Sequence, residues 1–356
     1  MNALIHRIGF AGPCQRLGAH KAQGVRSIAF HEAPSDERVD PAETMTRLST
    51  VLVTGATGFI GTALTPHLEA DARYAVHPLE QSVWQAGRLP APTEGAVLVH
   101  LAGRAHRPTR DASDEETERT FLRENAVATA NLARVAATMG VRRFVFMSSI
   151  KALGESTEHR SPFQPSDVPA PEDAYGRSKL AAEHALAEIG RETGMEIVIV
   201  RPPLVYGPGV KGNLASLLTW MQRGYPLPLG ALPDAPRSMV NVRNLVDLLV
   251  TLIDHPAAAG RTFHVRDDED VTTRALLLRL YAALGRARRL VPVPLSLLRP
   301  ATRLVGRAGM LERLTTPLQV DDSMTRTRIG WSPRWTLDEG IHDMVAAHAP
   351  QGDGHA

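Results

Sequence analysis

The sequence predicts an α/β fold in which helices cover both faces of a doubly wound parallel sheet. Three observations carry this prediction. Short apolar runs of the kind found in strands buried on both faces lie at 51–53, 96–101, 143–147 and 196–200. Segments with apolar residues at helical spacing alternate with these runs through about residue 200. A glycine-rich turn separates the first strand from the first helix.

The composition is that of an ordinary globular protein, since 43% of the 356 residues are hydrophobic and 22% are charged. The formal net charge of +2 gives no electrostatic case for nucleic-acid binding. Cys14 is the only cysteine, which excludes an intramolecular disulfide and a cysteine-built metal site, and we expect no metal. The single cysteine also fits a reducing compartment, and we expect a cytoplasmic location. No run of about 18 apolar residues occurs, so we expect no transmembrane helix.

Residues 1–44 differ from the rest of the chain. The first 30 residues carry four Lys or Arg and no acid, and they contain no continuous apolar core of a secretory signal. Three interpretations stay open: a disordered extension, an organellar presequence, or sequence translated ahead of a true start at Met45. We favour a disordered or artefactual segment and exclude it from the prediction of the fold.

The glycine turn lies in residues 50–61, TVLVTGATGFIG. Gly55, Gly58 and Gly61 follow a buried strand and open a helix. Such a turn lets the backbone approach a pyrophosphate, and the free N–H groups of the helix then point at that anion. Glycine patterns also occur in turns of other α/β proteins, but the strand before and the helix after favour a dinucleotide site.

An acid follows at the distance expected of such a site. Glu80 lies 19 residues past Gly61, where a carboxylate can accept hydrogen bonds from the adenosine ribose hydroxyls. This position favours NAD, with NADP as the alternative. The competing interpretation of Glu80 is a solvated loop carboxylate.

The pair Tyr175 and Lys179 opens a helix at spacing i and i+4, so the two side chains share one helix face. An ammonium beside a phenol favours the phenolate and lowers the pKa of the tyrosine. A dehydrogenase needs this device to move a hydroxyl proton near neutral pH. The YxxxK pattern alone is typical of surface helices, and it gains meaning from Ser148 and Ser149 at the end of an earlier strand.

Five motifs occur in order: GATGFIG, HLAG at 100–103, Ser149, YGRSK at 175–179 and RPPLVYGPG at 201–209. With them, the chain resembles the extended short-chain dehydrogenase/reductases, specifically the NAD-dependent epimerase/dehydratase family of nucleotide-sugar enzymes. The resemblance covers roughly residues 48–346. It implies a Rossmann-type NAD(P)-binding domain over 48–200, with 240–265 returning to it, and a smaller C-terminal substrate-binding domain over 201–239 and 266–346, followed by a tail at 347–356.

The resemblance also implies catalytic roles. Tyr175 would be the acid/base, Lys179 would hold the nicotinamide ribose and lower the pKa of Tyr175, and Ser149 would hydrogen-bond the reacting oxygen. Further residues would bind the cofactor: Gly55, Gly58, Phe59, Ile60 and Gly61 in the turn, Leu101, Ala102 and Gly103 beside the cofactor, and Asn125 on the helix at 121–139. Outside the resemblance, Asn125 reads as a solvated polar residue.

Two residues of the later chain match substrate contacts of the family. Asn213 would contact the nucleotide diphosphate, and Arg237 would bind it through paired, charge-assisted hydrogen bonds. The alternative for Arg237 is a surface arginine before a strand. The apolar and basic segment 290–310 leaves two possibilities open, contact with a membrane surface or packing on the substrate domain.

One departure from the family bears on the reaction. Many family epimerases read SSxxVYG, whereas this chain reads SSIKALGE at 148–155, with Leu153 at the usual tyrosine. This motif looks more like the nucleotide-sugar 4-ketoreductases of bacterial surface-polysaccharide synthesis, such as the enzymes that form UDP-N-acetylquinovosamine. Dehydration ranks lower, because Ile150 and Lys151 stand where a dehydratase has an added acid/base pair.

The resulting hypothesis is an NAD(P)-dependent oxidoreductase that reduces the 4-keto group of a nucleoside-diphosphate sugar, UDP-linked. The alternatives are a redox-neutral UDP-sugar 4-epimerase, a non-catalytic NAD(P)-binding module, and a reductase of small lipophilic ketones. The resemblance further implies a homodimer formed through the helices at 121–139 and 178–192. Residues 201–209 are expected to be irregular because of their prolines and glycines.

Overall fold

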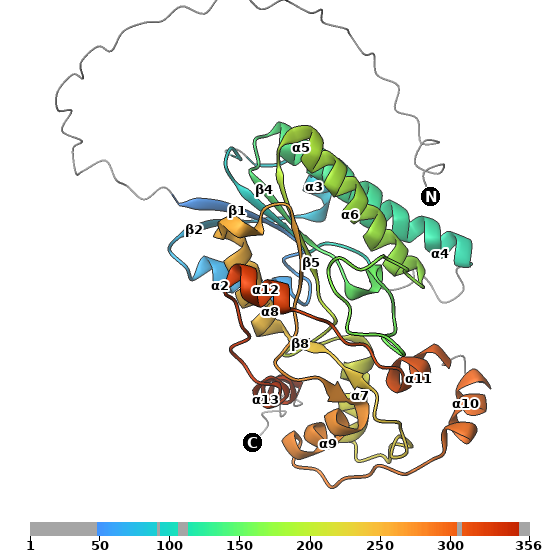
Figure 1. Ribbon diagram of the computed structural model, residues 1–356. Helices are drawn as coiled ribbons and strands as arrows, with labels where there is room; N and C mark the ends of the chain where they lie inside the picture. The colour runs from blue at the N-terminus through green and yellow to red at the C-terminus, as the bar shows by residue number, and fades with distance from the viewer. Residues whose placement is uncertain (1–47, 91–92, 106–112, 305–307, 349–356) are drawn as a thin grey trace, which may run out of the picture. The chain divides into compact units, whose positions relative to one another are not determined.

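The computed structural model of the protein describes residues 48–90, 93–105, 113–304 and 308–348 (Figure 1). All of them belong to one compact unit, Leu48–Ala356. The predictions for residues 1–44, for Cys14 and for the tail from 349 onward lie outside the described residues. In the described part of the chain, every helix is too short or too polar to span a bilayer.

The centre of the fold is a six-stranded sheet whose neighbouring strands all run parallel. The strand order is β2-β1-β3-β4-β5-β9. Each of the four apolar runs forms a strand, which confirms the predicted fold class. The bounds are β1 Ser49–Thr54, β2 Tyr74–Leu79, β3 Val97–His100, β4 Arg143–Met147, β5 Glu196–Arg201 and β9 Arg261–His264.

Helices cover both faces of this sheet (Figure 1). Alternate residues of β1 point to opposite sides, so Val51 and Val53 enter one core while Leu52 enters the other. The first core is closed by α2 (Gly61–Glu69), α8 (Val242–Asp254) and α12 (Ser323–Ile329). The second is closed by α3 (Gln81–Gln85), α5 (Ala128–Thr138) and α6 (Ala174–Thr193).

The helix expected over 121–139 is longer than the sequence indicated. It begins as α4 (Asp114–Phe121), passes through the π-helical turn η1 (Leu122–Val127) and continues as α5. Ser113 caps α4, because its side chain accepts a hydrogen bond from the backbone N–H of Glu116 at 3.1 Å.

A second group of elements surrounds another apolar core. Two small sheets contribute to this group, a parallel pair formed by β6 (Leu204–Tyr206) with β8 (Met239–Asn241), and an antiparallel pair formed by β7 (Pro236–Arg237) with β10 (Val271–Thr272). The helices around this core are α7 (Gly212–Gln222), α9 (Thr273–Ala283) and α13 (Leu337–His348). A smaller apolar cluster is formed with α10 (Leu295–Leu304) and α11 (Ala308–Thr315). Two single 3-10 turns are η2 (Ile150–Ala152) and η3 (Pro256–Ala258).

The expectation of irregular structure over 201–209 is wrong at β6. Pro202 and Pro203 precede this strand, so the missing proline N–H groups lie outside the parallel ladder that joins Leu204–Tyr206 to Met239–Asn241. The chain then returns to the large sheet through α8 and β9. The predicted domain boundaries remain predictions.

Candidate functional site

The glycine turn joins β1 to α2 and packs tightly against the end of β3. Gly55 has a φ of +71°, and a Cβ there would lie 2.7 Å from the backbone nitrogen of Ala102. A Cβ on Gly61 would lie 2.1 Å from the Gly55 carbonyl oxygen, and the Gly58 N–H donates to this oxygen at 2.9 Å. Only glycine therefore fits at these approaches.

The same turn leaves backbone donors available at the start of α2. Within the described part of the chain, no hydrogen bond is made by the N–H groups of Phe59 and Ile60. Together with the positive end of the helix dipole, such groups form an anion site. The turn therefore fits the pyrophosphate of a dinucleotide.

Replacing Gly61 with Ala tests this packing. We expect a loss of about 1–3 kcal/mol in the free energy of unfolding, because the new methyl group meets backbone atoms of the turn. NAD affinity should fall with it, as measured by calorimetric titration. Gly309→Ala in α11 is the matched control, since a Cβ there meets nothing within 4 Å. Equal stability and NAD affinity in the two variants would contradict the tight turn.

A buried histidine links β1, β3 and α5 beneath the turn. Hydrogen bonds join His100 Nδ1 to Thr54 Oγ1 at 2.6 Å and His100 Nε2 to Thr129 Oγ1 at 2.9 Å. The Thr54 hydroxyl also accepts from the Ala102 N–H at 3.3 Å. Burial, assisted by the charge of Lys179, lowers the pKa of His100 to about 3. His100 therefore stays neutral and fixes the strand end that carries Ala102.

This pKa predicts a pH dependence of stability. Unfolded His100 binds a proton below about pH 6.5, whereas the folded protein excludes it down to about 3. Stability is thus present above pH 6.5 and is lost as the pH falls, by about 1.4 kcal/mol per pH unit between pH 6 and 4. Urea unfolding of wild type and His100→Gln should show this slope in the wild type and a shallower one in the variant. Burial also lowers the pKa of His264 to about 4, so protonation of His264 lowers stability in the same pH range. His264 is present in both proteins and does not explain a difference between their slopes. Equal slopes would refute the assignment to His100.

Asn125 lies in the π-helical turn η1 and is only 1% exposed, so the interpretation as a solvated residue is wrong. Its side-chain oxygen accepts from the Arg104 N–H at 2.7 Å, and its amide donates to the Arg104 carbonyl at 3.0 Å and to Ser178 Oγ at 2.9 Å. Asn125 therefore ties the segment after Gly103 to α6. Single π-helical turns of this kind are frequent at functional sites.

Ser149, Tyr175 and Lys179 come together where β4 ends and α6 begins. Asp173 caps α6, because its carboxylate accepts from the Gly176 N–H at 2.7 Å. The side chain of Ser149 lies close enough to the phenol of Tyr175 to lower the pKa of that phenol. The buried Lys179 Nζ donates to the Met147 carbonyl at 2.9 Å and lies 5.9 Å from the centroid of the Tyr175 ring.

Gly103 lies against the same lysine. A Cβ on Gly103 would be 3.1 Å from Lys179 Nζ and 3.2 Å from Asn125 Oδ1. The carboxyl ends of β1, β3 and β4 therefore converge with the start of α6, at the edge where ligands bind in open α/β sheets. The predicted cofactor residues of the turn, the β3 end and η1 are thus neighbours of the predicted catalytic residues.

The pKa of Tyr175 runs against the expectation from sequence. Burial raises it to about 12, the hydrogen bond from Ser149 lowers it, and the charge of Asp173 raises it. Burial also lowers the pKa of Lys179 to about 8, while the charge of Glu183 raises it. The Lys179 ammonium donates to the Met147 carbonyl and lies 4.7 Å from the centroid of Phe146.

Two ionic networks next to the site were missed by the sequence reasoning. Lys151 Nζ bridges Glu155 Oε2 at 2.9 Å and Asp173 Oδ2 at 2.6 Å. Nothing in the sequence signals the second contact, since its partners are 22 residues apart. It places an ammonium two residues from Ser149 and a carboxylate two residues from Tyr175.

The second network is buried behind the strand ends. Ser148 Oγ donates to Glu183 Oε1 at 2.5 Å, and Arg201 donates to both carboxylate oxygens of Glu183, at 2.9 and 2.5 Å. The three residues are at most 6% exposed. Glu183 continues the Tyr175–Lys179 face of α6 at i+8, and this spacing is the signal that could have identified it.

The remaining predicted residues lie on other elements. Glu80 is exposed directly after β2, and Asn213 is exposed in the first turn of α7. Arg237 is half-buried in β7, and its Nη1 donates to the Thr316 carbonyl at 2.6 Å. Burial lowers the pKa of Arg237 to about 10, the charge of Arg313 lowers it further, and that of Glu155 raises it.

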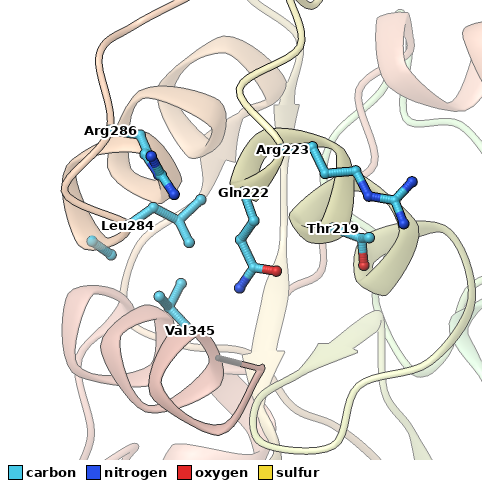
Figure 2. A pocket seen from close by; sticks show the side chains of 7 residues that line it. Thr219, Gln222, Arg223, Leu284, Arg286 and Val345 are labelled. Atoms are coloured by element: carbon cyan, nitrogen blue, oxygen red, sulfur yellow. The ribbon is translucent and has the colours of Figure 1, made fainter. Parts of the chain in front are cut away.

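Two surface pockets lie away from these residues. One, of about 490 Å³, is formed by the ends of α7, α9 and α13, and Figure 2 shows Gln222, Leu284 and Val345 around it. The other, of about 400 Å³, lies between the loop at 164–166 and the start of β9. Neither pocket is lined by a predicted site residue.

A parallel sheet with a glycine turn after its first strand defines a dinucleotide-binding α/β protein. Residues 51–265 match the model of the NAD dependent epimerase/dehydratase family, and the chain belongs to this family. It is therefore a member of an NAD-dependent enzyme family of epimerases and reductases, which agrees with the dinucleotide site predicted from the glycine turn.

Two relatives illustrate the family. The chain is 40% identical over 312 residues to a UDP-glucose 4-epimerase of Vibrio cholerae, covering 83% of this chain and 94% of the relative. It is 25% identical over 317 residues to a GDP-6-deoxy-D-mannose reductase of Pseudomonas aeruginosa, covering 83% and 96%.

Solved structures share the fold. The structure of RMD from Pseudomonas aeruginosa complexed with NADPH superimposes with a TM-score of 0.69 at 22% identity, covering 84% of this chain and 99% of that chain. The UDP-glucose 4-epimerase of Thermotoga maritima with UDP-glucose gives a TM-score of 0.66 at 20% identity, covering 84% and 98%.

Proposed function

We propose that the protein moves a hydride and a proton at C4 of a nucleoside-diphosphate sugar, UDP-linked. The observation that carries this proposal is that Ser149 and Tyr175 lie together beside Lys179 and Gly103. A non-catalytic binding module would not need a hydroxyl pair directed at one place beside a cofactor. That alternative therefore ranks lower.

Each of these residues has a distinct role in the proposed reaction. NAD supplies the hydride acceptor and donor when bound. Tyr175 exchanges the proton of the C4 hydroxyl, and Ser149 holds the same oxygen through its hydroxyl. Lys179, fixed by the Met147 carbonyl, binds the nicotinamide ribose hydroxyls. Glu80 binds the ribose at the adenosine end.

C4 epimerisation is the version that the Vibrio cholerae relative favours. Tyr175 first takes the C4 hydroxyl proton while C4 loses hydride, which gives a 4-keto sugar. The sugar turns over, hydride returns to its other face, and Tyr175 returns the proton. Atoms and electrons balance without an external reductant, so catalytic NAD suffices.

Net 4-keto reduction is the second version, and the protonation of Tyr175 favours it. A phenol whose pKa is about 12 is protonated at neutral pH, which is the state that donates to a forming alkoxide. The SSIKALGE motif points the same way. This version consumes one NAD(P)H for each keto sugar that is reduced.

The substrate class is proposed from Arg237 and Asn213. Arg237 is partly desolvated and keeps donors beyond the one given to Thr316, which suits a diphosphate. Asn213 would add a contact from α7. A reductase of small lipophilic ketones would need neither residue. A homodimer remains a prediction from the family resemblance.

A single set of assays separates these functions. Purified protein is incubated with UDP-glucose, UDP-N-acetylglucosamine and a 4-keto-6-deoxy UDP-sugar, while absorbance at the NAD(P)H band and the products are followed. Inversion at C4 without added NAD(P)H supports the epimerase, and stoichiometric NAD(P)H consumption with the keto sugar supports the reductase. Thermal stabilisation by UDP tests the substrate class. The proposal would be wrong if the protein turned over none of these substrates and UDP did not raise its melting temperature.

A further inference from the structure

The segment 286–304 combines exposed apolar side chains with a high density of arginine. It contains five arginines and no acidic residue. Among the described residues, none forms an ion pair with Arg286, Arg288, Arg299 or Arg303. The arginines are all exposed. Their charge is therefore available to a partner.

Helix α10 within this segment has two apolar faces. Leu295 and Leu298 face inward and join the cluster formed with Leu232 and Leu311. A second stripe at i, i+3, i+4 and i+7 consists of Leu297, Pro300, Ala301 and Leu304, all of them exposed. Leu297 is 62% exposed and Leu304 is 88% exposed, values that a core helix does not show. The inward face packs α10 onto this cluster, whereas the outward stripe has no packing partner among the described residues.

Two arginines border the outward stripe. Arg299 and Arg303 lie at i and i+4, so they form a basic edge along one side of α10. Figure 1 shows α10 beside α11 at the margin of the described elements. An exposed apolar stripe with an arginine edge is the arrangement of helices that lie in a membrane interface.

Two exposed aromatic side chains lie near the end of α7 and on the loop that follows it. The ring centroids of Trp220 and Tyr225 are 5.0 Å apart, and the two side chains are 48% and 47% exposed. The loop that carries Tyr225 is tied to the segment, because the Leu227 N–H donates to the Arg289 carbonyl at 2.8 Å and the Val291 N–H donates to the Leu227 carbonyl at 2.8 Å. Trp and Tyr are favoured where one end of a side chain is apolar and the other is wet.

We infer that α10, together with the exposed aromatic pair Trp220 and Tyr225, forms a docking surface for an anionic lipid membrane. Charge complementarity favours a membrane, because the segment combines arginines with bulky apolar side chains, and anionic lipids attract such a surface. The segment contains no acidic residue that would pair with a basic partner protein. The stripe would enter the headgroup region, and the arginines would remain with lipid phosphates. The inference goes beyond the proposed reaction and does not depend on it.

Co-sedimentation with vesicles tests this surface. The full chain is mixed with vesicles of phosphatidylcholine containing phosphatidylglycerol and with vesicles of pure phosphatidylcholine. We expect binding to the anionic vesicles that weakens with salt. Arg299→Glu with Arg303→Glu should lower the binding constant by at least about 25-fold, since each basic residue near an anionic surface contributes about fivefold. Leu297→Ser with Leu304→Ser should lower it by about tenfold or more.

The matched control reverses two exposed arginines elsewhere, Arg191→Glu with Arg328→Glu, and changes net charge by the same amount. Its binding should fall far less than that of the α10 charge variant. Unchanged melting temperature and NAD binding show that each variant is folded. Absence of anionic-vesicle binding at low salt, or equal losses in the α10 and control variants, would overturn the inference. So would a concentration-dependent dimer that the Leu297→Ser, Leu304→Ser variant dissociates, because a second copy would then cover the stripe.

Discussion

Tyr175→Phe is expected to lower kcat of the C4 reaction by about 10²- to 10⁴-fold, because it removes the hydroxyl that exchanges the C4 proton. The ring is kept, so its edge contact with Phe121, at a centroid distance of 6.0 Å, should persist. NAD affinity and melting temperature should stay close to the wild-type values. Turnover is measured by product analysis with the substrate that the assays above identify.

A comparison with Tyr225→Phe makes this result specific. Tyr225 is exposed on the loop after α7, so removal of its hydroxyl should leave kcat unchanged. Ser149→Ala should also reduce kcat, and the double variant should lose less than the product of the two single losses, since both hydroxyls serve one oxygen. Wild-type turnover by Tyr175→Phe would remove Tyr175 from the mechanism, and with it the main support for the proposed function.

Breaking the buried pair of Glu183 and Arg201 is expected to cause the largest loss of stability. Among the described residues, Arg201→Met leaves the buried carboxylate of Glu183 with the hydroxyl of Ser148 as its remaining side-chain partner. Removing one member of a buried ion pair costs about 3–5 kcal/mol in the free energy of unfolding. Urea unfolding followed by circular dichroism measures this loss.

A double variant and an exposed pair supply the controls. Glu183→Leu with Arg201→Met should recover much of the loss, because no uncompensated charge stays buried. Arg134→Ala breaks the exposed pair with Glu192, whose N–O distance is 2.9 Å, and should cost about 1 kcal/mol or less. If Arg201→Met were no more destabilising than Arg134→Ala, the buried network would not hold these elements together.

Asn125, Lys179 and Glu183 show which contacts of the site can be predicted from sequence and which cannot. The helix face shared by Tyr175, Lys179 and Glu183 follows from spacing alone, since a helix fixes which residues are neighbours. The contacts beyond that face do not. Lys179 bonds the Met147 carbonyl, and Asn125 bonds Arg104 and Ser178, because β3, β4, η1 and α6 meet in space.

The pKa of Tyr175 failed as a sequence prediction for a related reason. Spacing predicted an ammonium near the phenol, but it carried no information on how deeply the phenol is buried or where the ammonium donates. In the folded protein, burial and the charge of Asp173 outweigh the hydrogen bond from Ser149.

The sequence by itself determined the strands and the glycine turn. Apolar runs specify strands with two covered faces, and the three glycines are required wherever backbone atoms approach as closely as at Gly61. Only the tertiary structure decided the charge partners, such as Lys151 with Asp173 and Glu183 with Arg201. The physical reason is that the spacing of residues along the chain determines local geometry. The partner of a charged side chain depends instead on which strand ends lie side by side, and the strand order β1-β3-β4-β5 sets that arrangement.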